Sequence, residues 1–119
     1  MAKIVLADNE DTNRAIHKKL LEDRGHEVHV FRNGLEALTY IQQNKADIVI
    51  ADLDMPIMDG VDLLQNLKGY QLKRVLSSGA YSSISELKKS YGEVECDLYL
   101  SKPISIDDFL KKISEVLNE

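Results

Sequence analysis

Two acids and one lysine in this chain are placed where they could act together on a phosphoryl group. Asp8, Asp52 and Lys102 follow short apolar segments at residues 4–7, 48–51 and 98–100. Such segments are typical of buried strands, and parallel strands end at the same edge of a sheet. Carboxylate oxygens suit Mg²⁺, and a cation suits phosphoryl oxygens. These positions therefore favour a site that holds Mg²⁺ and a phosphoryl group.

The segment after Asp52 is expected to be a loop. Pro56 lacks the N–H group that strand pairing needs, and Asp59-Gly60 is typical of a turn that leads into a helix. The carboxylate of Asp52 is therefore predicted at the tip of a buried strand, where it is free to react.

Strand-like and helical patterns alternate along the whole chain. The strand-like segments are Ile4–Ala7, Val28–Phe31, Ile48–Ala51, Val75–Ser77 and Leu98–Leu100. The helical patterns begin near Thr12, Asn33, Asp59, Ser83 and Ser105. Alternating β and α units predict a parallel sheet that is covered by helices on both faces.

The composition of the strands predicts their order. Segments 4–7 and 48–51 are continuously apolar, as central strands are, whereas the second and fifth segments alternate, as edge strands do. With right-handed crossovers, this favours a flavodoxin-like (βα)5 doubly wound α/β sheet of order 2-1-3-4-5. The ligand site of such a sheet lies beside its first and third strands. We therefore expect Asp8 and Asp52 to meet there.

Length and composition exclude several classes of protein. The 119 residues predict one domain, residues 1–119, and a net charge of −5 argues against binding of nucleic acid. No segment approaches the ~20 apolar residues of a membrane span, and the start of the chain shows no signal-peptide pattern. The single Cys96 fits a reducing compartment. The chain is thus expected to be cytoplasmic, with no membrane or nucleic-acid partner.

The three histidines do not predict a metal site. His26 and His29 are three apart on a strand, so their side chains face opposite ways. His17 lies in a helical pattern and is expected in solvent. None of them is therefore assigned to the site.

Four motifs give the chain a resemblance to the receiver domains of two-component response regulators. The motifs are Asp8-Asn9-Glu10, the nine residues 52–60, Leu76-Ser77-Ser78-Gly79 and Tyr99-Leu100-Ser101-Lys102-Pro103. They stand in the right order at the predicted strand ends, and the resemblance covers essentially the whole chain. It implies a bacterial signalling domain that is not an enzyme beyond its own phosphorylation and dephosphorylation.

The resemblance implies that Asp52 is the phosphoacceptor and that Mg²⁺ is the cofactor. Asp8, Asn9, Asp52 and Asp54 match the positions that bind the metal, and Asp54 does so through its backbone carbonyl. Asn9 departs from the family, which usually has a carboxylate there. One carboxylate ~4 Å from Mg²⁺ is worth about 2 kcal/mol at the dielectric of water, so its loss is expected to weaken metal binding roughly 30-fold.

The resemblance also assigns the residues that respond to the phosphoryl group. Lys102 matches the lysine that pairs with the phosphoacceptor, and a cis bond to Pro103 is implied. Ser78 matches the hydroxyl that donates to the phosphoryl group. Tyr99 matches an aromatic switch that is expected to swing from solvent into space beside the fifth strand.

The implied partners are proteins. A histidine kinase or a histidine phosphotransfer protein is the expected phosphoryl donor. In similar proteins a downstream target or a second copy binds the fourth helix, the fifth strand and the fifth helix. Output from a domain of this kind therefore passes through its surface.

A phosphatase of the haloacid-dehalogenase type is one alternative, because Asp52-Leu53-Asp54 copies its nucleophile–acid spacing. Pro56 replaces the Thr or Val expected there, and the nucleophile should follow the first strand. Asp107 and Asp108, its possible distal acids, fit better as first-turn helix acids.

Two further alternatives share the fold. A flavodoxin-like electron carrier needs a neutral loop for the flavin phosphate, and the acids in Asp8–Asp11 would repel it. A degenerate receiver would keep the fold without taking phosphate. Asn9 favours that alternative, whereas Asp52, Ser78 and Lys102 argue against it.

Overall fold

The computed structural model describes residues 1–118 and contains a parallel sheet in the predicted order. Its strands are β1 (Lys3–Ala7), β2 (Glu27–Phe31), β3 (Ile48–Asp52), β4 (Lys73–Ser78) and β5 (Leu98–Ser101). They are hydrogen-bonded in the order β2-β1-β3-β4-β5, and every pair is parallel. The flavodoxin-like (βα)5 fold is therefore confirmed.

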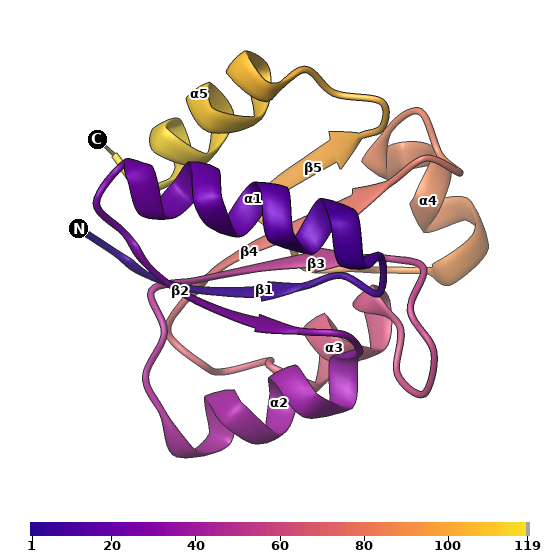
Figure 1. The fold of residues 1–119 in the computed structure, drawn as a ribbon. Coiled ribbons are helices and arrows are strands. Elements are labelled where there is room, and N and C mark those ends of the chain that lie inside the picture. Colours follow the sequence, from indigo (N-terminus) through magenta and orange to yellow (C-terminus); the bar gives the residue numbers. More distant parts are fainter. Residues whose placement is uncertain (119) are drawn as a thin grey trace.

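Helices cover both faces of the sheet (Figure 1). They are α1 (Asp11–Asp23), α2 (Gly34–Gln43), α3 (Gly60–Asn66), α4 (Ile84–Tyr91) and α5 (Ile106–Val116). Side chains of α1 and α5 pack with one face of the sheet, and side chains of α2, α3 and α4 pack with the other. Each of the five helices is far shorter than the ~20 residues that span a bilayer, and none in residues 1–118 is a candidate span.

Four helices begin at the polar residues that the sequence singled out. The side chains that accept the N–H group three residues later are those of Asn33, Asp59, Ser83 and Ser105. Each bond satisfies one of the N–H groups that a helix start leaves without a partner. The first helix differs, because it begins at Asp11 without a side-chain cap.

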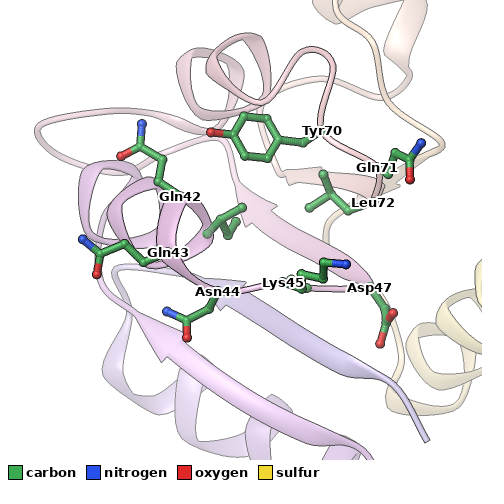
Figure 2. Close-up of a pocket in the computed structure, with 10 residues that line it drawn as sticks. Gln42, Gln43, Asn44, Lys45, Asp47, Tyr70, Gln71 and Leu72 are labelled. Atoms are coloured by element: carbon green, nitrogen blue, oxygen red, sulfur yellow. The ribbon is translucent and has the colours of Figure 1, made fainter.

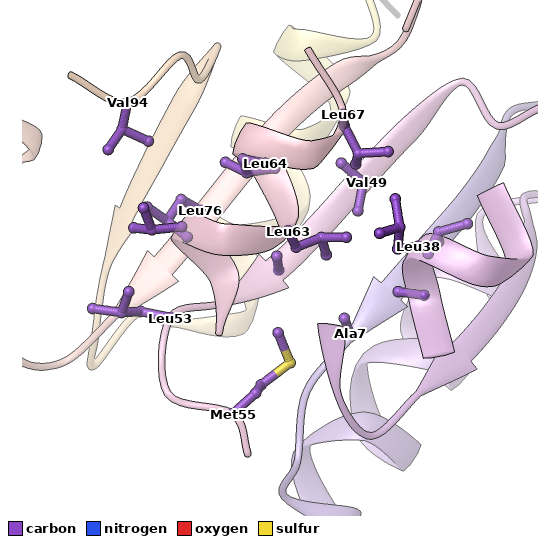
Figure 3. Packing of buried hydrophobic residues seen from close by; sticks show 14 of the residues in the cluster. Ala7, Leu38, Val49, Leu53, Met55, Leu63, Leu64, Leu67, Leu76 and Val94 are labelled. Atoms are coloured by element: carbon purple, nitrogen blue, oxygen red, sulfur yellow. The ribbon is translucent and has the colours of Figure 1, made fainter. Parts of the chain in front are cut away.

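Alternation along the strands builds the two cores. Val49 and Ala51 face the core under α2 and α3, whereas Ile48 and Ile50 face the core under α1 and α5. Figure 3 shows the first of these cores, with Met55 of the β3–α3 loop among its side chains. Burial on both faces explains why β3 is continuously apolar up to its last residue, Asp52.

Candidate functional site

Strand register brings Asp8 and Asp52 together at the carboxyl edge of the sheet. Ala7 of β1 is the partner of Ala51 of β3, so the next residue of each strand is an aspartate. Both side chains belong to buried residues, with Asp8 4% exposed and Asp52 9% exposed. The fold therefore places two carboxylates at neighbouring strand ends, although they are 44 positions apart in sequence (52 minus 8).

Lys102 directly follows β5, the edge strand of the sheet, and its side chain extends to Asp52. Its backbone N–H donates to the Ser78 carbonyl at 2.8 Å, which extends the pairing of β4 with β5. Its Nζ lies 3.2 Å from Oδ2 of Asp52. The peptide bond to Pro103 is cis, as the resemblance implied. The lysine that the resemblance assigned to Asp52 is thus the ion-pair partner of that residue.

Burial dominates the electrostatics of Asp52. Loss of solvent raises the pKa of this carboxyl above its ordinary value, Lys102 opposes the rise, and the charge of Asp8 adds to it. Two carboxylates with one ammonium leave an excess of negative charge in a partly buried place. A further cation would relieve it.

The oxygens around the pair suit a hard cation. Oδ1 of Asp8 accepts the Glu10 N–H at 2.9 Å, while the side chains of Asn9 and Asp54 belong to exposed residues on the loops at either side. The Asp54 N–H lies 3.4 Å from Oδ1 of Asp52, which is a long contact. Residues 1–118 place no three His, Cys, Asp or Glu side chains together as a metal site. This donor set fits Mg²⁺, which is commonly held by one or two carboxylates together with water and phosphate oxygens.

Ser78 ends β4, and Tyr99 lies on the neighbouring strand β5. Ser78 is 3% exposed, and its Oγ accepts the N–H of Ala80 at 2.9 Å. The Tyr99 hydroxyl donates to the carbonyl of Tyr81 at 2.6 Å, and burial raises its pKa. The ring is half-buried and packs against the core, whereas the sequence predicted it in solvent.

His17 is a residue of this site that the sequence did not assign. It was expected in solvent, but its ring stacks on Phe109 of α5 at 4.3 Å between centroids. It lines a small cavity together with Asp8, Asp52 and Lys102. Burial lowers its pKa, so the imidazole is held toward its neutral form. The rotation of α1 about its axis decides which side chains face the site. The sequence does not predict that rotation, because α1 has only a weak apolar stripe.

Cys96, His26 and His29 have structural roles, away from the carboxyl edge of the sheet. Cys96 is half-buried before β5, and burial raises its pKa, which keeps it a thiol. Nδ1 of His26 accepts the Ala2 N–H at 3.0 Å, and His29 stacks on Tyr40. Neither histidine lies near the carboxyl edge of β1 and β3.

A surface groove lies at the opposite, amino edge of the sheet (Figure 2). It has a volume of about 430 Å³ and lies between the end of α2 and the segment before β4. Tyr70 and the amides of Gln42, Gln43 and Asn44 are among its lining residues. It contains none of the residues assigned to chemistry.

Fold and site together define a class of protein: a parallel (βα)5 domain with a lysine-paired aspartate in an acidic pocket at the carboxyl edge. Residues 4–114 match the family model of the response regulator receiver domain. The chain therefore belongs to this family, whose members act in two-component signalling.

Individual relatives agree with this assignment. The polar-differentiation response regulator DivK of Brucella anthropi is 26% identical over 119 residues, covering 98% of this chain and 96% of the relative. The receiver domain of the Francisella response regulator 1452 is 27% identical, with a TM-score of 0.86 over 99% of this chain and 98% of that one. The chemotaxis response regulator CheY4 of Vibrio cholerae is 26% identical, with a TM-score of 0.84 over 98% of both chains.

Proposed function

We propose that this domain accepts a phosphoryl group on Asp52 and thereby switches a protein-binding surface. The observation that carries the proposal is the ion pair between Lys102 Nζ and Oδ2 of Asp52, at 3.2 Å, beside the buried Asp8. A carboxylate held at a strand tip with a lysine on one side is placed to attack phosphorus and to keep its product paired. The proposed donor is a histidine kinase or a histidine phosphotransfer protein in the cytoplasm.

The proposed transfer forms one bond and breaks one. An Asp52 oxygen bonds to phosphorus while the phosphorus–nitrogen bond of the phosphohistidine breaks, and the electron pair leaves with the imidazole. Lys102 keeps its charge next to the new acyl phosphate. Asp8, Asp52, the main chain of Asp54 and the amide of Asn9 would hold Mg²⁺, which supplies positive charge against the phosphoryl oxygens.

The proposed switch uses Ser78 and Tyr99. The phosphoryl group offers the Ser78 O–H a charged acceptor, while the Ser78 Oγ at present accepts the N–H of Ala80. A hydrogen bond to a charged group is worth about 1.5–3 kcal/mol, enough to shift a conformational population on the order of tenfold to a hundredfold. Tyr99 is linked to the same loop through Tyr81. The change would thus reach the surface of α4, β5 and α5, where a target or a second copy is proposed to bind.

Labelling with a small phosphodonor tests this function. We expect acetyl phosphate and Mg²⁺ to label the protein up to about one phosphoryl group per chain, with the acid and base lability of an acyl phosphate. Mass spectrometry of the intact chain measures the stoichiometry. A phosphatase would instead turn over a phosphomonoester many times, and a degenerate receiver would stay unlabelled. Either result would contradict the proposal.

Asn9 is expected to make labelling depend on high concentrations of Mg²⁺. Asn9→Asp should lower the Mg²⁺ midpoint of acetyl phosphate labelling by up to roughly 30-fold, because a carboxylate ~4 Å from the ion adds about 2 kcal/mol. Gln71→Glu is the matched control, since it makes the same change in net charge at an exposed position before β4. Coincident midpoints for Asn9→Asp and the wild type would show that Asn9 does not limit metal binding.

A further inference from the structure

The first turn of α2 touches the loop that follows Asp52. The Gly34 N–H donates to the carbonyl of Met58 at 3.0 Å. A Cβ atom on Gly34 would lie 2.5 Å from that carbonyl oxygen and 2.9 Å from Cγ of Met58. The backbone of α2 can approach the loop this closely because residue 34 has no side chain.

The loop is tightly closed where Gly34 holds it. The Met58 N–H donates to the Pro56 carbonyl at 2.7 Å, which forms a three-residue turn centred on Ile57. Ile57 has a φ of 71°, a region that costs a β-branched residue on the order of 1–3 kcal/mol. Its side chain is 77% exposed, so its own packing does little to hold this conformation. Contacts made by its neighbours must therefore stabilise the turn.

Two other contacts fix the ends of the loop. Leu53 and Met55 are buried in the core, where Figure 3 shows both side chains. The Gly60 N–H donates to the Leu53 carbonyl at 3.1 Å. With Leu53 and Met55 buried on either side of Asp54, the part of the loop that has no buried side chain begins at Pro56 and includes Met58. The contact with Gly34 lies in that part.

From these contacts we infer that Gly34 is a positioning residue for the phosphoacceptor site. It sets the place of the β3–α3 loop, and through it the main chain of Asp54 beside Asp52. The inference rests on the proposed function, in which that main chain helps to hold Mg²⁺. Gly34 itself lies on another element and touches neither the metal nor the phosphoryl group in this mechanism.

Gly34→Ala tests the inference. The Met58 carbonyl would have to move about 0.9 Å to reach ordinary contact (3.4 minus 2.5). A misplacement near 1 Å can cost on the order of a hundredfold in a reaction that depends on position. We expect the Mg²⁺ midpoint of labelling to rise at least tenfold. In the metal-free protein, the backbone amide signals of Asp54 and Met58 should shift in NMR spectra.

Ile41→Ala is the matched control. Ile41 is a buried residue of α2, about two turns beyond Gly34, so its truncation destabilises the helix at a distance from the contact with Met58. We expect this variant to keep the wild-type amide signals in the loop and the wild-type Mg²⁺ midpoint. The double variant Gly34→Ala, Met58→Ala should behave as Gly34→Ala, because the closest clash is with a backbone oxygen.

A milder pair of variants applies if Gly34→Ala does not fold. Asn33→Ala removes the cap of α2, whose Oδ1 accepts the Glu36 N–H at 2.9 Å, and should shift the same loop amides by less. Ser83→Ala removes the equivalent cap of α4 and should leave them unchanged. Unmoved loop amides in both Gly34→Ala and Asn33→Ala, or rescue by Met58→Ala, would overturn the inference. A wild-type chain that takes no label would instead overturn the proposed function, and the amide shifts would still report on Gly34.

Discussion

Asp52→Asn is expected to abolish labelling by acetyl phosphate or by a phosphohistidine donor. The amide lacks the charged oxygen that attacks phosphorus, and the remaining neighbour Asp8 is tied to the Glu10 N–H. We expect less than about one hundredth of the wild-type label, since a nucleophile is removed and nothing replaces it. Intact-mass measurement at a fixed time and Mg²⁺ concentration gives the result. Undiminished acid-labile label in this variant would remove Asp52 from its assigned role.

Asp54→Asn is the control for charge and position. Asp54 lies two residues away on the exposed part of the loop, and its proposed contribution comes from the main chain, which the substitution keeps. We expect this variant to be labelled at saturating Mg²⁺. Loss of label in both variants would show that net charge in the pocket, and not the Asp52 nucleophile, governs the reaction.

Stability measurements show whether Asp52→Asn leaves the fold intact. The pKa of Asp52 is raised in the folded protein, chiefly by burial, so ionisation of this carboxyl weakens the fold. The stability that the protonated acid gives is present below its unfolded pKa and is lost as pH rises through the folded pKa. Asparagine resembles the protonated form at every pH. The variant should therefore be at least as stable as the wild type at pH 7, and its advantage should shrink as pH falls through the folded pKa of Asp52 and vanish below the unfolded pKa.

The sequence was most informative where local chemistry decides the structure. The residues Asn33, Asp59, Ser83 and Ser105 cap the helices that they were predicted to begin. Apolar strands with acids at their ends predicted which strands would be central. That order then fixed which strand ends meet, so the neighbouring positions of Asp8 and Asp52 followed without any contact information.

Features that depend on the rotation of a helix or on close backbone contact could not be predicted in this way. His17 was expected in solvent because it lies in a helical pattern, but its packing against Phe109 depends on how α1 lies across α5. The role of Gly34 depends on a carbonyl 24 residues further along (58 minus 34). An Asn-Gly pair at a helix start gives no sign of such a distant neighbour.

The predicted start of β4 was two residues too late, because side-chain contacts from distant parts of the chain allow charged residues in this strand. Lys73 and Arg74 are charged, so the strand was predicted from Val75, whereas the structure begins it at Lys73. Arg74 is 6% exposed although it is charged. Its backbone N–H donates to the Asp97 carboxylate at 2.8 Å, and its carbonyl accepts the Asp97 N–H at 2.7 Å. These bonds continue the β4–β5 pairing beyond the apolar residues.

Replacing Arg74 by methionine is expected to cost about 3–5 kcal/mol of the free energy of unfolding. The guanidinium donates to the carbonyls of Leu67, Tyr70 and Leu72, and so joins the end of α3 to β4. Its Nε is buried without a hydrogen-bond partner in residues 1–118, so the fold already bears part of the burial cost. Methionine would leave the carbonyls without their donor at about 1–3 kcal/mol for each one that water cannot reach. Chemical denaturation measures the loss.

Glu95→Gln separates the carbonyl bonds from the ion pair at Arg74. The Glu95 carboxylate lies 3.5 Å from Nη1, but its side chain is 62% exposed, so this pair is worth about 0–1 kcal/mol. If Glu95→Gln destabilises the chain as much as Arg74→Met does, the carbonyl bonds are not the cause. Arg74 lies at the amino edge of the sheet, and Asp52 lies at the carboxyl edge. The amount of label per folded molecule should therefore stay at the wild-type level in Arg74→Met, whereas Asp52→Asn should carry almost no label.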